Sequence, residues 1–200
     1  MPLIRKTSDQ TPAVGEPGEA DLRSSSVEVR WTAARAAADR PNSVSALAQA
    51  LGCETDMRVR EAIFTALARL ATPESVAAVL PYLRSDDASL RTGSMDVLRA
   101  VPTLLRTRIA DLLADPDDDV RLLSCELARA LDAPEAQTLL LSLIETDRAP
   151  NVCAAAIEVL SEIGDVTARP VLARCAARFP DDPFLGFAVK VAVERLNGQP

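Results

Sequence analysis

The sequence predicts an all-α fold, a solenoid of stacked helix pairs, and three observations lead to this prediction. The first is an apolar residue followed by Arg that recurs along the chain, with successive occurrences 30, 31, 30, 32 and 33 residues apart. The occurrences are Val29-Arg30, Val59-Arg60, Leu90-Arg91 and Val120-Arg121, and the series continues as Val152-Cys153 and Leu185-Gly186. Self-similarity at a period of about 20–50 residues is typical of solenoids, in which each unit buries its apolar face against its neighbours.

Composition is the second observation, because the chain is 48% hydrophobic but only 3% aromatic. A core of this kind is built from Ala, Leu and Val, and Ala favours helices packed closely together.

The third observation is that aligned units place apolar residues in columns three positions apart, which is the spacing of one helix face. These columns are Ala34, Phe64, Met95, Cys125 and Ile157, followed by Ala37, Leu67, Leu98, Ala128 and Leu160. The column between them is expected to face solvent, and it contains Arg35, Thr65, Asp96, Glu126 and Glu158.

A helix breaker follows the first helix of each unit. The breakers are Pro41, Pro73, Pro102, Pro134 and the Gly164-Asp165 pair. Pro is tolerated at a helix start because its missing N–H would be unpaired there. Second helices are therefore expected over residues 43–51, 74–84, 103–114, 135–145 and 166–178, joined to the next unit by acidic loops whose Asp residues cap helix N-termini.

The two ends of the chain depart from the repeat. Residues 1–23 contain Pro and Gly among polar residues, so we expect a flexible tail there and a repeat domain over residues 24–200. A short apolar and basic stretch in the tail, Leu3, Ile4, Arg5 and Lys6, either docks into a partner or is disordered. The last unit is incomplete, and we interpret its Phe179, Phe184 and Phe187 as a cap on the stack.

The repeating unit resembles HEAT repeats, and among them the short bacterial kind found in phycobilisome-lyase-like proteins. The resemblance rests on an Asp before the apolar-Arg step (Asp56, Asp87 and Asp117), a Pro or Gly-Asp turn and a second helix rich in Ala and Leu, and it covers residues 24–196. It implies a right-handed α-solenoid of about five and a half helix-turn-helix repeats. Unit five departs from the pattern, because Cys153 stands where Arg is expected.

The recurring arginines, Arg30, Arg60, Arg91 and Arg121, are expected to form a structural ladder. Each guanidinium would bridge loop carboxylates such as Asp56, Asp87 and Asp117, or those of a neighbouring unit, through the bidentate geometry that favours Arg over Lys.

Two regions are candidates for binding a partner. Trp31 and Arg35 lie on faces of the first unit that should be exposed, where such residues are favoured as hot spots; the alternative is that the tail folds over Trp31. The second helices present Tyr82, Arg106, Arg108, Arg169 and Arg174. These arginines form either a local basic patch or an ordinary solvated face.

The composition argues against several functions. The chain has no histidine, which removes His-based catalysis and His metal sites, so we expect no catalytic residues, metal or cofactor. A net charge of −7 disfavours nucleic acid as a partner. No apolar run is long enough for a membrane span. Four cysteines without CxxC spacing indicate free thiols in the cytoplasm.

We therefore expect a non-enzymatic adaptor that presents a solenoid surface to another protein, plausible in bacterial signalling. The alternative, which rests on the resemblance alone, is a subunit of a bilin lyase or a chaperone for a cofactor-bearing protein. The sequence names neither the partner nor the oligomeric state.

Overall fold

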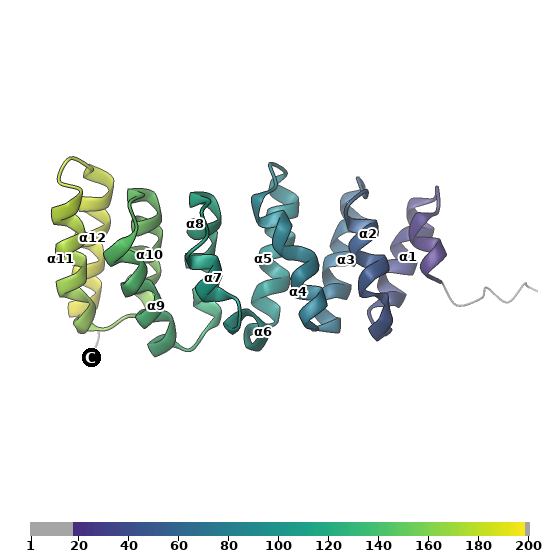
Figure 1. Ribbon diagram of the computed structural model, residues 1–200, viewed down its shortest axis with the longest axis horizontal. Coiled ribbons are helices and arrows are strands. Elements are labelled where there is room, and N and C mark those ends of the chain that lie inside the picture. Colours follow the sequence, from purple (N-terminus) through teal and green to yellow (C-terminus); the bar gives the residue numbers. More distant parts are fainter. Residues whose placement is uncertain (1–17, 199–200) are drawn as a thin grey trace, which may run out of the picture.

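The computed structural model describes residues 18–198, which form an elongated row of helix pairs (Figure 1). The described residues make five pairs and one further helix, so the prediction of an all-α solenoid of about five and a half units is confirmed. The first helices are α1 (Val27–Ala37), α3 (Met57–Leu70), α5 (Ala88–Ala100), α8 (Asp118–Leu127), α10 (Pro150–Ile163) and α12 (Pro183–Asn197).

Acidic loop residues start most of these first helices, as expected. The carboxylate that precedes the helix accepts backbone N–H groups of the first turn, which have no partner inside the helix. These capping residues are Asp56 before α3, Asp87 before α5, Asp117 before α8 and Asp182 before α12.

The second helices begin near the predicted breakers but are less regular than the first. They are α2 (Val44–Leu51), α4 (Pro73–Val79), α6 (Pro102–Arg106), α7 (Ile109–Leu113), α9 (Ala133–Thr146) and α11 (Arg169–Arg178). Short 3-10 helices extend the pairs: η2 (Pro41–Ser43), η3 (Leu80–Arg84), η4 (Ala128–Ala130) and η5 (Val166–Ala168).

One predicted second helix, residues 103–114, is divided into α6 and α7. At the break the Thr107 hydroxyl donates to the carbonyl of Leu104 at 2.7 Å, and the Arg108 N–H donates to the carbonyl of Leu105 at 2.8 Å. Bonds to the residue three positions earlier tighten the turn and end the α-helical pattern. Similarly, α4 gives way to η3 where Pro81 supplies no backbone N–H.

The N-terminal boundary differs from the expected tail over residues 1–23. Glu19–Arg23 forms a 3-10 helix, η1, which contacts α1 and α2. Leu22 is 4% exposed, and Arg23 donates to Gln49 Oε1 at 2.6 Å. Burial of this leucine against the first pair holds η1 in place, so the described part of the repeat domain begins before residue 24. Residues 1–17, with the Leu3–Lys6 stretch, lie outside the described residues.

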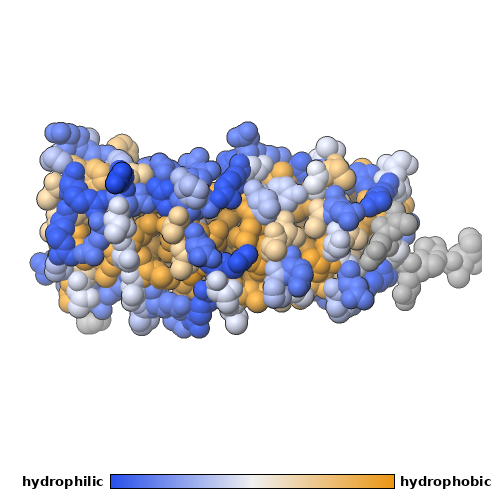
Figure 2. Space-filling view, in the orientation of Figure 1, coloured by the Kyte–Doolittle hydropathy of each residue, from blue (hydrophilic) through white to orange (hydrophobic). Residues whose placement is uncertain are grey.

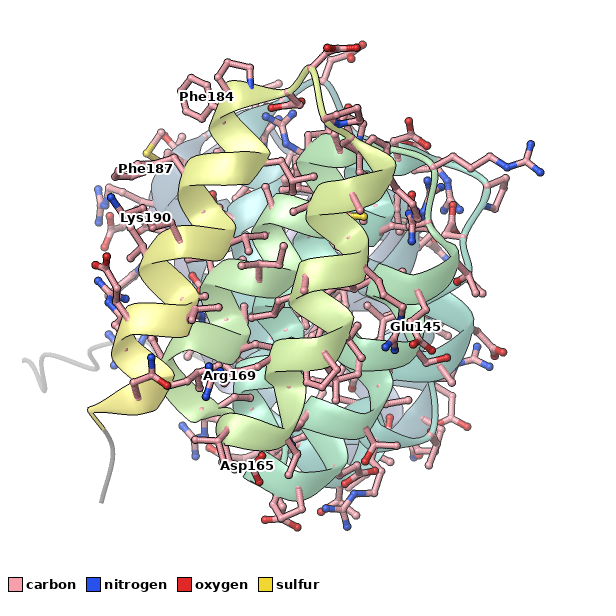
Figure 3. All side chains as sticks on the ribbon, turned by 90° about the vertical axis from the view of Figure 1, so that its left-hand side faces the viewer. Glu145, Asp165, Arg169, Phe184, Phe187 and Lys190 are labelled. Atoms are coloured by element: carbon pink, nitrogen blue, oxygen red, sulfur yellow. The ribbon has the colours of Figure 1, made fainter. Side chains whose placement is uncertain are left out.

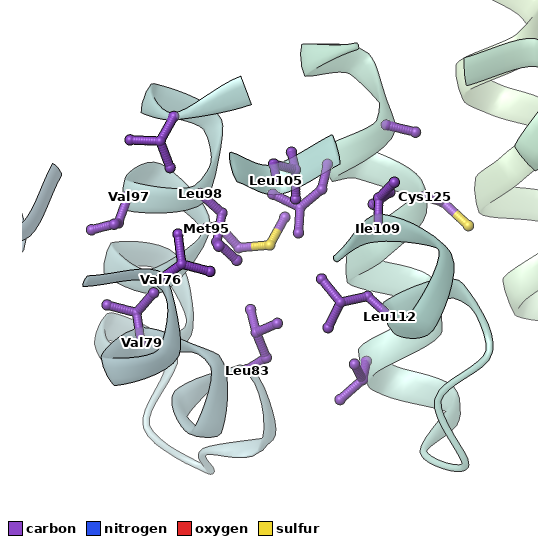
Figure 4. Packing of buried hydrophobic residues seen from close by; sticks show 14 of the residues in the cluster. Val76, Val79, Leu83, Met95, Val97, Leu98, Leu105, Ile109, Leu112 and Cys125 are labelled. Carbon is purple, nitrogen blue, oxygen red and sulfur yellow. The ribbon is translucent and has the colours of Figure 1, made fainter. Parts of the chain in front are cut away.

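The core runs through the whole stack and contains the columns predicted from the sequence. All ten residues of the two apolar columns are buried. Figure 4 shows Leu83, Met95 and Leu105, from η3, α5 and α6, pointing into one space between neighbouring elements. Along the long face seen in Figure 2, apolar side chains form a band between polar side chains.

Candidate functional site

The ladder arginines share one contact within their own units. Each guanidinium donates to the backbone carbonyl six residues earlier, which ties the loop to the first helix. The acceptors are Ser24 for Arg30, Glu54 for Arg60, Ser85 for Arg91 and Asp115 for Arg121.

Three of the four arginines also bind a carboxylate in the loop that leads to the next unit. The ion pairs are Arg30 with Glu54 at 2.7 Å, Arg60 with Asp87 at 2.6 Å and Arg121 with Asp147 at 2.7 Å. Asp87 was an expected partner and also caps α5, whereas the partners of Arg30 and Arg121 are Glu54 and Asp147 and not Asp56 or Asp117. Within residues 18–198, Arg91 donates only to Ser85.

The electrostatics of the ladder explain why its carboxylates remain charged. Burial alone would raise the pKa of Asp147, but hydrogen bonds from Arg121 and from the Ala149 N–H outweigh burial and lower it. The pKa of Asp87 is lowered to about 2 by hydrogen bonds from Ser89 and Arg60. These groups therefore hold the stack together and are not poised for proton transfer.

Unit five compensates for its missing ladder arginine from another helix. The Cys153 thiol occupies the ladder position and donates to the carbonyl of Asp147, six residues earlier, at 3.8 Å. Arg178, at the end of α11, donates to that same carbonyl and to the carbonyls of Ile144 and Glu145 at 2.5 and 2.7 Å. Arg178 thus restores the missing rung, a role that the sequence analysis did not identify.

Trp31 is half-buried and packs against the core rather than standing free in solvent. Two guanidinium groups flank its ring, Arg35 at 4.6 Å and Arg58 at 5.5 Å from the ring centroid. Arg58 also pairs with Glu28 at 3.5 Å. Trp31 and Arg35 therefore lie together in a cation–π cluster on the first-helix side of the stack, and their role in binding a partner stays a prediction.

Two of the four arginines expected on the second helices bind carboxylates. Arg106 binds Asp132 and Glu135, both at 2.7 Å, and Arg174 binds Glu145. Their charges are therefore balanced by carboxylates of adjacent elements.

The other residues expected on the second helices differ in exposure. Arg108 and Arg169 are exposed, whereas Tyr82 is half-buried, and burial raises its pKa.

A groove of about 640 Å³ lies between α10 and α12, on the first-helix side. We call it the α10–α12 groove. Its lining includes Leu122, Ala154, Ala155, Phe184, Phe187 and Val191. Phe184 is 87% exposed and Phe187 is 66% exposed. In Figure 3, which looks onto the end of the stack, both side chains lie along the edge of α12 away from α11.

The start of α12 positions these two phenylalanines. The Asp182 carboxylate accepts the Leu185 N–H at 2.9 Å and caps the helix. Leu185 then points into the core, while Phe184 and Phe187, three positions apart, share the adjacent face. Phe184 and Phe187 therefore lie exposed at the end of the stack, whereas Phe179 is half-buried beside Arg178.

Column alignment contained a signal for this groove. Phe187 falls in the column of Trp31, Glu61, Thr92 and Ala154, and Phe184 in that of Glu28 and Arg58. Glu28, Arg58, Glu61 and Thr92 are exposed, whereas Trp31 and Ala154 are half-buried against the core. The column of Phe184 is therefore the clearer signal of an exposed aromatic residue.

Acidic side chains surround the groove. Glu126, Glu158 and Asp182 supply three carboxylates, and Arg195 supplies one guanidinium, which donates to the Ser161 hydroxyl at 3.0 Å. The Glu126 carboxylate also binds Arg129 at 2.9 Å. The groove therefore combines an apolar lining with an excess of negative charge. No cluster of three potential metal ligands occurs within residues 18–198, and no helix in that range is long and apolar enough to cross a membrane.

These features define the class of the protein, an α-solenoid whose units are joined by an arginine ladder. The chain belongs to the HEAT-repeat family, because residues 19–99 and 105–186 match that family. The expectation of HEAT repeats is thus confirmed. No curated protein matches the sequence.

Several solved structures are similar to the chain. An engineered protein shares 17% identity, with a TM-score of 0.41 over 90% of this chain and 94% of that one. A designed armadillo repeat protein shares 15% identity, with a TM-score of 0.39 over 90% and 98%. The complex of CpcE and CpcF of phycocyanin lyase from Nostoc sp. PCC7120 shares 16% identity, with a TM-score of 0.40 over 98% and 100%.

Proposed function

We propose that this chain is a non-enzymatic adaptor that binds a basic, amphipathic segment of a partner protein in the α10–α12 groove. The single observation that carries the proposal is the exposure of Phe184 and Phe187 beside an apolar groove. Contiguous exposed apolar surface of this kind marks interaction sites in folded proteins. The four free cysteines are in keeping with an adaptor of the reducing cytoplasm.

The chemistry of the groove determines the kind of segment that fits. Apolar side chains three or four positions apart on a partner helix would lie against Phe184, Phe187 and Val191, which are spaced in the same way on α12. Lys or Arg beside these anchors would face the carboxylates of Glu126 and Glu158. Burying an exposed Phe side chain contributes about 1.5–3 kcal/mol, so each of the two anchors should make a measurable contribution to binding.

A displayed library of random 16-residue peptides tests this proposal. Selection on the wild-type chain should enrich peptides with apolar residues at helical spacing and basic residues between them. Phe184→Ser or Phe187→Ser should lower the affinity for the selected peptides by about tenfold or more, since about 1.4 kcal/mol corresponds to tenfold in affinity.

Val166→Ser is the matched control, because Val166 is also an exposed apolar residue, at 53%, but does not line the groove. This variant should bind the selected peptides as the wild type does. Peptides that bind Phe184→Ser and Phe187→Ser with unchanged affinity would remove the groove from consideration. An enrichment of acidic peptides would contradict the proposed charge of the partner.

A further inference from the structure

Two carboxylates of the ladder share a position in the chain. Glu54 and Asp147 each lie two residues before the N-cap residue of the next first helix. Each accepts the backbone N–H of that N-cap residue, at 2.8 and 2.9 Å, and also binds the guanidinium of the preceding ladder arginine. This position therefore indicates where a carboxylate of the ladder is expected at other junctions.

Asp115 has this position at the junction between units three and four, but it binds a different arginine. It lies two residues before the N-cap residue Asp117 and accepts its N–H at 2.9 Å. Its side chain is 11% exposed and pairs with Arg84 of η3, which also lies 4.0 Å from the Asp117 carboxylate. Arg91, the ladder arginine of unit three, keeps only its contact with the Ser85 carbonyl, at 2.5 Å, within the described residues. The carboxylate that Arg91 would bind is thus in place but held by Arg84.

The packing of the first helices is also loosest at this junction. α5 packs against α8 less extensively than any other two consecutive first helices pack against each other. A cavity of about 310 Å³ lies there, which we call the α5–α8 seam, and its lining includes Leu83, Arg84, Arg91, Asp117 and Leu122. The seam therefore leaves room for α5 and α8 to approach each other.

The second helix of unit three is divided at the same junction. In Figure 1, α6 lies beside α5 and α7 lies beside α8, and each of these two pairs of helices is in contact. The turn at Thr107 and Arg108 joins α6 to α7. A few residues at the ends of elements are enough to absorb the φ/ψ change of a hinge. The backbone can therefore bend at this turn while the helices on each side keep their packing.

We propose that the chain bends at the turn between α6 and α7, and that the α5–α8 seam closes when Asp115 exchanges Arg84 for Arg91. In the closed form the pair of Arg91 and Asp115 continues the ladder across the junction, as the forward ion pairs do in units one and four. The cation–π cluster at Trp31 and the α10–α12 groove lie on opposite sides of the junction, so bending changes their relative orientation. A partner that touches both surfaces would bind one form better and shift the population toward it.

Distances between two spin labels on the full chain, measured by pulsed electron paramagnetic resonance, test the proposal. One label is attached to Cys53, which is exposed, and the other to Arg148→Cys, at an exposed position in the loop before α10. The other three cysteines are buried and should stay unlabelled. Both labels lie in loops that carry ladder carboxylates, one on each side of the seam, so closure should shorten the distance between them.

Two substitutions change the partner of Asp115. Arg84→Ala frees the carboxylate for Arg91, so the distance between the labels should become shorter by at least about 1–2 Å, the size of helix shifts at switching interfaces. Arg84→Ala combined with Arg91→Ala should return the distance to that of the wild type, because neither arginine then draws Asp115 across the seam.

Labels on Cys53 and on Glu74→Cys are the matched control, because both positions are exposed and lie on the same side of the junction. Their distance should be the same in all three chains, which also shows that the units remain folded. A distance between residues 53 and 148 that Arg84→Ala leaves unchanged would overturn the proposal. Shortening that persists when Arg91 is also removed would overturn it as well, since closure would then not depend on the ladder arginine.

Discussion

Removal of the Arg121 side chain tests whether the ladder holds the units together. Arg121 is 14% exposed and its partner Asp147 is 3% exposed at the side chain, and the two groups share two hydrogen bonds of 2.7 and 3.1 Å. Arg121→Ala leaves the Asp147 carboxylate buried without its counter-charge. Breaking a buried pair in this way costs about 3–5 kcal/mol.

The matched control is another ion pair between elements of the stack, at the surface. Arg106 and Asp132 are also 2.7 Å apart, but their side chains are 49% and 80% exposed. Arg106 also binds Glu135 at 2.7 Å, and the Glu135 side chain is 34% exposed. Because each such pair near the surface contributes about 0–1 kcal/mol, Arg106→Ala should cost less than Arg121→Ala. The two substitutions remove the same type of side chain and differ in burial.

Urea denaturation followed by circular dichroism measures both variants. We expect the free energy of unfolding to fall by about 3–5 kcal/mol for Arg121→Ala and by no more than about 2 kcal/mol for Arg106→Ala, which loses two pairs. The double variant Arg121→Met with Asp147→Leu should recover much of the loss, because it removes the buried charge as well as its partner. Equal losses for the two single variants would refute the view that burial gives the ladder its strength.

Three further predictions concern pH, packing and the single tryptophan. The pKa of Asp87 is about 2 in the folded chain against an ordinary 3.8, so its ionised form stabilises the fold above that ordinary value; this contribution should disappear in urea titrations as the pH falls toward 2, and Asp87→Asn should show a smaller loss. A Cβ at Gly93 would lie 2.2 Å from the Phe64 ring, whereas a Cβ at Gly186 meets nothing within 4 Å; Gly93→Ala should therefore lower the free energy of unfolding by about 1–3 kcal/mol and Gly186→Ala raise it by about 0.5–1 kcal/mol, and a melting experiment that gave both the same sign would contradict this packing. Because guanidinium groups flank Trp31, iodide should quench its fluorescence more than caesium does, and equal quenching by the two ions would show that the flanking charges do not act at the ring.

The sequence predicted the stack because its period and its columns are local properties of the chain. Apolar residues such as Phe64 and Leu98 occupy the same positions in each unit, three residues apart along one helix face. Their burial could therefore be predicted from the sequence. The break between α6 and α7 was not predictable in this way, because it involves a local hydrogen bond from the Thr107 hydroxyl to the Leu104 carbonyl that no repeating pattern indicates.

The candidate site was less predictable than the fold, since it depends on contacts between distant parts of the chain. Arg178 lies 25 residues after Cys153, outside any column that contains the ladder arginines. The groove was missed for another reason. Phe184 and Phe187 were interpreted only as part of a terminal cap, although their columns contain exposed residues such as Glu28 and Glu61.

The ion pairs of the ladder run from each unit to the loop that follows it, which affects how repeats can be added or lost. In units one, two and four the arginine reaches forward to the following loop, so a duplicated or deleted internal unit would still present a donor to an acceptor. In unit five Arg178 restores only the backward contact, to carbonyls at the end of α9 and to Asp147 in the loop before α10. Gain or loss of repeats during evolution should therefore be tolerated ahead of unit five, whereas a unit added after it would meet Cys153 in place of an arginine and lack the forward ion pair.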